Sequence, residues 1–424
     1  MSSRSITYVQ GVALYMGAVL GSGILILPGN TAELAGPASI ISWVLMSLLS
    51  IPLAYTFARL ALAYEHYGGV ATIVGQAYGR TWSAIVGWLF FVWVCCGQAV
   101  VGLTGAGYIS AVFGLPEAAT YGFAWLFLVA AAVTNWLGMR ASAAFSLVLS
   151  GTVLVLLLLT IGFSLPDVRA EHFTPFAPGG ISGIGQACVL IFWAFFGWES
   201  ITHLVPEFRR PQRDVMRATW SSVFLIGAVY TLLSVVTVGT GGYGADGTNA
   251  PLAALMSRAI GVSAGFATAI VACIVCAGTL NVYLASSSRL CYAMAEERKL
   301  PRWFLQRNKQ GTPQRGVLFF FVTNTLTLAA SLLFKIPVEE LILVPTSLGI
   351  FVYIIASFAC VKLLWKDRIG RVSALLAAVC CTAVAPFSYG YLVCPIVVAA
   401  VCVVYLRWRE ASDGVQLEKT GIEG

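Results

Sequence analysis

The sequence contains few charged residues. Asp, Glu, Lys and Arg make up 10% of the 424 residues, whereas a soluble domain carries roughly a quarter. Hydrophobic residues make up 59%, and the mean hydropathy is +0.86. A water-soluble globular protein of this size is therefore excluded. The composition instead predicts a chain that crosses a membrane many times.

The residues that most enzymes need are also scarce. There are three histidines, His66, His172 and His203, and no glycine-rich phosphate-binding loop. A membrane enzyme would need paired histidines or carboxylates on facing helices, and the sequence offers only Glu199 with His203 at helical spacing. We therefore predict neither an enzyme nor an ATP-driven pump. A channel or a signalling receptor is a further alternative.

The eleven cysteines all fall inside apolar runs. Cys273 and Cys276 have the spacing of metal ligands, but no second pair and no histidine is near them in the sequence. Buried cysteines of this kind behave as small hydrophobic side chains. We therefore expect no disulfide framework, no metal site and no cofactor.

Twelve long apolar runs occupy most of the chain. A helix that spans a bilayer needs about 20 mostly apolar residues. Backbone polar groups cannot stay unpaired in hydrocarbon, so each run is predicted to be a helix. The predicted spans are 8–35, 38–63, 82–113, 121–139, 143–165, 181–207, 216–240, 263–294, 315–335, 339–363, 372–388 and 391–407. The fold class is thus an all-α polytopic membrane protein.

The positions of Lys and Arg predict the orientation of these helices. If the N-terminus is inside, the inner segments hold 22 of the 25 basic residues, and the outer segments hold only Arg169, Arg258 and Lys335. Inner loops of membrane proteins carry such an excess, so both termini are expected in the cytoplasm. The net charge of +7 then reflects topology, and no nucleic-acid partner is expected.

Two of the predicted helices contain features that interrupt a helix at mid-membrane. In the first, Gly21, Ser22 and Gly23 weaken the helix, because glycine favours irregular backbone. In the sixth, Glu199 lies two residues after Gly197. Inserting a charged side chain near the membrane centre costs about 3 kcal/mol of free energy. Backbone groups freed at that depth need partners, and a bound solute can supply them.

The two interruptions lie five helices apart. An inverted repeat of five plus five helices produces this separation, with the ligand at the midplane. The second half of the first helix begins near Gly23. Its N-terminus carries partial positive charge, which suits a carboxylate. A single glycine could serve helix packing alone, but two interruptions at corresponding positions favour a transporter.

At these positions the chain resembles the amino acid–polyamine–organocation (APC) family. The matching segments are residues 21–24 with Pro28 in helix one, 195–199 in helix six, 210–214 in the following turn and 288–295 at the end of helix eight. The resemblance covers at least residues 8–310. The segment 197–208 looks most like the bacterial exporters of methionine and branched-chain amino acids.

The resemblance implies a LeuT-type fold of twelve helices. Residues 1–165 would form the first repeat of five helices, and residues 181–364 the second repeat. Residues 371–408 would form two peripheral helices, and residues 409–424 a cytoplasmic tail without regular structure.

The resemblance also implies a substrate site. Ser22 and Gly23 should bind the carboxylate of an amino acid, and the backbone carbonyls of Val19, Trp193 and Phe196 should bind its ammonium group. The C-terminal end of a helix carries partial negative charge and attracts a cation, which is consistent with an ammonium group at these carbonyls. The remaining expected members are Ile24 and Gly197 at the interruptions, Gln98 on helix three, and Asn281 and Tyr283 on helix eight.

Coupling and gating residues are expected near this site. Glu199 matches the helix-six acid that relatives use in gating or proton sensing, and His203 follows it on the inner half of the helix. Many relatives carry a lysine in helix five, which residues 146–154 lack. The coupling ion is thus open between H⁺ and Na⁺. Ser286 and Ser287 could bind Na⁺ or bond back to a helix carbonyl.

We predict a secondary transporter of neutral, hydrophobic L-amino acids in the cytoplasmic membrane, which works by alternating access and can serve export. The alternatives are an amino acid/polyamine exchanger and a cationic amino acid permease, the latter if Glu199 points at the substrate. The expected partners are a small-molecule amino acid and membrane lipid. Both a monomer and a homodimer are compatible with the sequence.

Overall fold

The computed structural model describes residues 6–64, 69–137, 143–203, 205, 208–244, 250–309 and 311–420. Within these residues the chain is helical, and its one β-type pairing is an isolated bridge between Ile6 and Phe208. The α-helices are α1 (Tyr8–Val19), α2 (Gly23–Ala35), α3 (Ser39–Ala63), α4 (Val70–Tyr78), α5 (Arg80–Phe113), α6 (Glu117–Trp136), α7 (Ala143–Ser164), α8 (Gly180–Phe192), α9 (Pro211–Gly239), α10 (Pro251–Ile260), α11 (Val262–Glu296), α12 (Gln314–Phe334), α13 (Val338–Leu363), α14 (Arg368–Val384) and α15 (Val393–Thr420). Two 3₁₀ helices, η4 (Trp193–Phe195) and η5 (Trp198–His203), follow α8.

Ten helical stretches of the described residues are long and apolar enough to cross a membrane. Two of these stretches, Gly23–Ala63 and Arg368–Ala411, each contain two of the α-helices. Each of the twelve predicted apolar runs falls on one or more of the helices. The protein is therefore an all-helical, multi-pass membrane protein.

The structure adds three features that the sequence analysis did not predict. The helices α4 and α10 have 9 and 10 residues and are too short to cross a bilayer. They pack against α5 and α11, respectively. The tail expected to be irregular after Trp408 instead continues α15 to Thr420, so that expectation was wrong.

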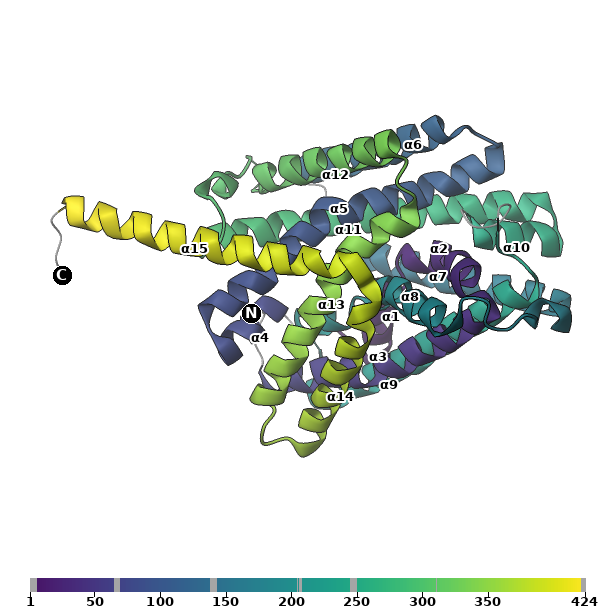
Figure 1. Cartoon of the computed structure of the whole chain (residues 1–424), viewed down its shortest axis with the longest axis horizontal. Coiled ribbons are helices and arrows are strands. Elements are labelled where there is room, and N and C mark those ends of the chain that lie inside the picture. The colour runs from purple at the N-terminus through teal and green to yellow at the C-terminus, as the bar shows by residue number, and fades with distance from the viewer. Residues whose placement is uncertain are drawn as a thin grey trace.

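Two long helix pairs enclose the middle of the bundle (Figure 1). α5 packs along α11, and α3 packs along α9. The shorter helices α1, α2 and α8 lie between these pairs. Small residues allow the close approach, since a Cβ added to Gly105 of α5 would lie 2.8 Å from the Cβ of Cys276 on α11.

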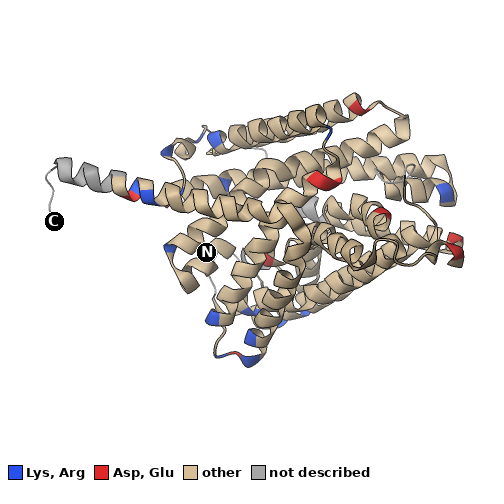
Figure 2. Ribbon diagram, viewed as in Figure 1, with Lys and Arg blue, Asp and Glu red and all other residues tan. Residues whose placement is uncertain are grey.

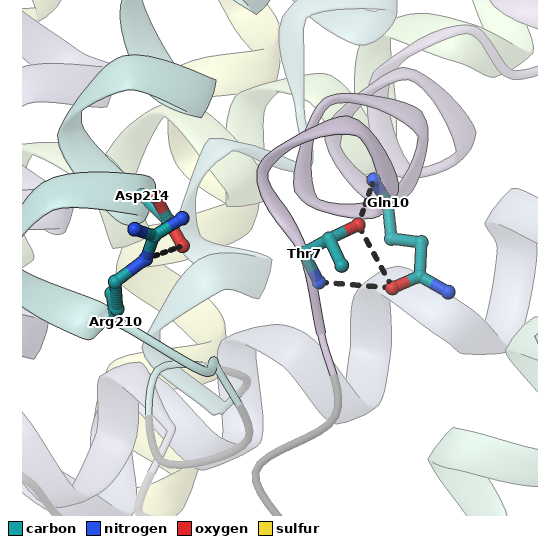
Figure 3. Close-up of polar contacts among 4 residues, drawn as sticks. All are labelled: Thr7, Gln10, Arg210 and Asp214. Atoms are coloured by element: carbon teal, nitrogen blue, oxygen red, sulfur yellow. Dashed lines mark hydrogen bonds and ion pairs between the residues drawn. The ribbon is translucent and has the colours of Figure 1, made fainter.

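Side chains stabilise two helix starts at one end of the bundle (Figure 3). The hydroxyl of Thr7 accepts the Gln10 N–H at 3.4 Å, and the Gln10 side chain accepts the Thr7 N–H at 2.9 Å. This reciprocal pair satisfies donors that the first turn of α1 leaves free. Arg210 and Asp214 form an ion pair of 3.7 Å at the start of α9.

The start of α1 is also tied to the segment that precedes α9. The Arg209 N–H donates to the Ile6 carbonyl at 3.0 Å. The Phe208 ring packs so closely on α1 that a Cβ added to Gly11 would lie 2.6 Å from its Cε1 atom. The start of the first predicted span is therefore joined to the segment that follows the sixth.

A third polar contact connects α3 with α14. Arg59 donates to Asp367 Oδ2 from Nε at 2.7 Å and from Nη2 at 2.6 Å, while Asp367 Oδ1 accepts the Gly370 N–H at 3.1 Å. Burial alone would raise the pKa of Asp367. The Gly370 N–H and the Arg59 guanidinium outweigh burial and hold that pKa below its ordinary value.

Candidate functional site

The first predicted span is interrupted between α1 and α2. The Leu20 N–H still bonds to the Met16 carbonyl at 2.7 Å, but the ψ angle of Leu20 is +66°, which ends the helix. After Gly21 and Ser22, α2 begins at Gly23. The first N–H groups of a helix have no partner within it. The interruption therefore leaves the positive end of α2 inside the bundle.

The sixth predicted span is interrupted after α8. The chain passes through η4 and then becomes extended at Phe196, with φ −71° and ψ 147°. Gly197 has φ +120°, a conformation that residues with a Cβ rarely adopt. η5 begins at Trp198. The carbonyl end of α8 therefore also lies inside the bundle.

The two interruptions contact each other. A Cβ added to Gly23 would lie 2.9 Å from Trp193 Cδ1 and 3.1 Å from Ala194 Cα. A Cβ added to Gly197 would lie 2.6 Å from the Ala18 carbonyl oxygen. Glycine is therefore needed at both positions for this close approach.

A cavity with about 520 Å³ of empty space, including the part open to solvent, lies between the interruptions, α5 and α11. Seven of the ten predicted substrate-binding residues line it: Val19, Ser22, Gly23, Gln98, Trp193, Phe196 and Tyr283. The other described residues in its lining are Ala18, Gly21, Trp93, Val94, Gly97, Val101, Ala194 and Thr279. None of these described lining residues carries a formal charge at neutral pH.

Three aromatic rings form one wall of this cavity. The rings of Trp93 and Phe196 are 4.8 Å apart between centroids, and the ring of Trp193 lies 6.0 Å from that of Trp93. Gly97 leaves room for this group, because its added Cβ would be 3.1 Å from Trp193 Cη2. The sequence analysis missed Trp93, since tryptophans in an apolar run equally indicate packing.

Gln98 is the polar side chain of α5 in the cavity wall. It is buried, and its amide nitrogen has no hydrogen-bond partner within the described part of the chain. A buried donor without a partner is costly. A bound molecule with an acceptor could satisfy it.

Tyr230 on α9 connects the two interruptions. Its hydroxyl lies 3.0 Å from the Val19 carbonyl and 3.2 Å from the Ala194 carbonyl, so it can donate to either. The ring is fully buried and packs edge-on against Trp43 and Phe195. The sequence analysis missed it, because one tyrosine in an apolar run does not reveal its hydroxyl's partner.

Glu199 is directed toward α13. Its carboxylate accepts the Gly197 N–H at 3.0 Å and the hydroxyl of Tyr353. The Tyr353 ring lies tilted beside that of Phe196, which lines the cavity, with 5.3 Å between the two centroids. Glu199 itself is absent from the described lining of the cavity. It therefore holds the second interruption against α13.

Three predicted positions on α11 are absent from the described lining of the cavity and make other contacts. The Asn281 side chain turns to α6, where its Oδ1 accepts from Thr134 at 2.8 Å and from Asn135 at 2.6 Å, so it does not line the cavity. The hydroxyls of Ser286 and Ser287 donate to the Tyr283 carbonyl at 3.0 and 2.6 Å. Both serines therefore bond back to their own helix.

The remaining predicted residues lie beside the cavity or outside the described part. Ile24 is fully buried in α2, and Gly197 contacts Ala18, but neither is in the cavity lining. His203 ends η5, and its side chain is outside the described residues. Its predicted gating role therefore stays a prediction.

The family follows from comparison with known sequences. The model of the amino acid permease family matches residues 6–408. The chain belongs to this family. An uncharacterized amino acid permease of Bacillus subtilis, YecA, is 38% identical over 96% of each chain. The L-methionine/branched-chain amino acid exporter YjeH of Escherichia coli is 30% identical over 84% of this chain and 85% of its own length.

Another relative and a solved structure extend the comparison. The branched-chain amino acid permease BcaP of Bacillus subtilis is 24% identical over 77% of this chain and 74% of its own length. A manganese transporter of Eremococcus coleocola has a similar fold, with a TM-score of 0.56 at 11% identity, over 95% of this chain and 93% of that one. The chain is thus a permease and not an enzyme.

Proposed function

We propose that this permease is a secondary transporter of neutral, hydrophobic L-amino acids that works by alternating access. The contact between the two interruptions across one cavity carries the proposal. The N–H groups at the start of α2 would bind the substrate carboxylate. The carbonyls at the ends of α1 and α8 would bind the ammonium group.

The cavity lining supports a neutral side chain. Trp93, Trp193 and Phe196 offer apolar surface, and the described lining contains no acid that would pair with a cationic side chain. Glu199 is bound to the Gly197 N–H and to Tyr353. A cationic amino acid or a polyamine is therefore disfavoured as substrate.

We propose the LeuT-type arrangement as the structural basis of transport. Residues 1–165 and 181–364 would be the two inverted repeats, and residues 371–408 the peripheral helices. The interruptions in the first and sixth predicted spans, together with the fold likeness to a transporter, support this division. Tyr230 would hold both interruptions in register.

We also propose that both termini lie in the cytoplasm and that transport couples to protons through Glu199. Lys and Arg gather toward one end of the bundle, while Asp and Glu dominate the opposite end (Figure 2). Ser286 and Ser287, the candidate Na⁺ ligands, bond to their own helix. The similarity to the exporter YjeH supports export as the direction.

Counterflow in proteoliposomes tests this function. Vesicles loaded with unlabelled leucine should accumulate labelled leucine, isoleucine, valine or methionine, and should not accumulate labelled lysine or putrescine. The same vesicles are measured with and without Na⁺ and a pH gradient. Counterflow of lysine or putrescine alone would overturn the substrate class, and flux without exchange acceleration would indicate a channel.

A further inference from the structure

A second cavity lies at the end of the bundle where Lys and Arg gather. It has about 870 Å³ of empty space, including the part open to solvent, and lies between α6, α11 and the segment before α12. It is separate from the cavity at the interruptions, since the two share no lining residue. Its charged lining residues are Arg289, Glu296 and Arg307.

Neither arginine has a counter-ion within the described part of the chain. The side chains of Arg289 and Arg307 form no hydrogen bond or ion pair there, and neither does the side chain of Glu296. The positive-inside rule explains why arginines occur at this end. It does not explain why two of them, both lacking a counter-ion, line the same cavity.

The structure holds Arg307 in a defined position. Its guanidinium lies over the Tyr292 ring at 3.8 Å from the centroid. This stacking leaves the N–H groups at the edge of the guanidinium plane free to donate. The neighbouring Asn308 fixes the segment, because its side chain donates to the Trp136 carbonyl at 2.7 Å and accepts the Thr312 N–H at 2.8 Å.

The cavity lies at the level where the membrane helices end. α6 ends at Trp136, α11 ends at Glu296, and α12 begins at Gln314. Trp136 and Trp303 are both partly exposed, and tryptophan is enriched at the level of lipid headgroups. A ligand can therefore enter this cavity from the membrane.

We propose that this cavity binds the phosphate of a phospholipid headgroup through Arg289 and Arg307. Guanidinium groups match phosphate oxygens in geometry and charge. Basic cavities between membrane helices on the cytoplasmic side are suited to such headgroups. Glu296 opposes an anionic headgroup and limits the strength of binding. The proposal is independent of which amino acid the protein transports.

Native mass spectrometry of the purified full-length protein tests the site. The probes are phosphatidylglycerol, phosphatidylcholine and soluble glycerol 3-phosphate. Arg289→Gln and Arg307→Gln should each weaken phosphatidylglycerol binding about fivefold, the effect of one basic residue near a membrane surface. Glu296→Gln should strengthen binding by a similar factor.

Arg371→Gln is the matched control. Arg371 also stacks on an aromatic ring, Trp365 at 4.5 Å, but it does not line this cavity. It should leave phosphatidylglycerol binding unchanged. Equal losses in the control and the two site variants would show a general charge effect and overturn the proposal.

Two further outcomes would also overturn it. Wild-type binding of phosphatidylglycerol in both site variants would exclude the arginines as ligands. Weakened binding of glycerol 3-phosphate with unchanged phosphatidylglycerol binding would assign the cavity to a soluble phosphate compound. Because lipid binding is read directly, a failure here leaves the counterflow result of the transport proposal intact.

Discussion

The substitution Gly197→Ala tests whether the contact between the two interruptions is needed for transport. Gly197 has φ +120°, and its added Cβ would lie 2.6 Å from the Ala18 carbonyl oxygen. The backbone strain costs about 1–2 kcal/mol, and moving the packed carbonyl costs about 1–3 kcal/mol. Together these reduce the population of the native interruption by a factor of roughly 30 or more.

Counterflow of leucine in proteoliposomes measures the effect. The initial rate of Gly197→Ala should fall at least tenfold. Gly261→Ala is the matched control, because Gly261 has φ +104° but no atom within 4 Å of its added Cβ. The control should lose some thermal stability and keep its transport rate. A folded Gly197→Ala protein that transports at the wild-type rate would show that transport does not need this close contact.

Four further predictions concern the same site and the ion pair between Arg59 and Asp367. Gly23→Val should abolish counterflow, because its Cβ would lie 2.9 Å from the facing indole ring; unchanged counterflow would contradict the carboxylate site. Glu199→Gln should alter the dependence of transport on pH, and an unaltered pH profile would remove its proton role. The double substitution of Ser286 and Ser287 by Ala should leave the transport rate within twofold with or without Na⁺, since both hydroxyls bond to their own helix; loss of a Na⁺-stimulated rate would show that they bind the ion. Asp367→Asn keeps the helix cap and loses the ion pair, so unfolding followed by tryptophan fluorescence in detergent should show a loss of about 0.2–1 kcal/mol. Because the folded pKa of Asp367 is lowered, this loss should persist above pH about 4 and vanish as the pH falls through the folded pKa; a difference that does not change with pH would contradict the ion pair.

The sequence was sufficient to locate the membrane helices and both interruptions. A long apolar run must pair its own backbone polar groups in lipid, and a helix does this within the run. The helices could therefore be predicted from the apolar runs alone. Gly23 and Gly197 were visible because glycine at mid-membrane is a local signal. The short helices α4 and α10 were missed because they are too short to produce a membrane-spanning run.

The partners of individual side chains were harder to predict. The helical positions of Asn281 and Tyr283 differ by only two residues, yet one faces α6 and the other lines the cavity. A shift of about 200° around a helix separates such positions, and the sequence does not fix which face is inward. The partners of the Tyr230 hydroxyl could likewise not be predicted, because only the fold brings the Val19 and Ala194 carbonyls together.

Competition binding shows whether the facing interruptions recognise both charged ends of an amino acid. Labelled L-leucine is bound to the purified protein and challenged with L-leucine, N-acetyl-L-leucine or L-leucinamide. Only L-leucine should compete, because the acetyl group removes the ammonium charge and the amide removes the carboxylate. Competition by both derivatives at the affinity of L-leucine would contradict recognition of the charged ends.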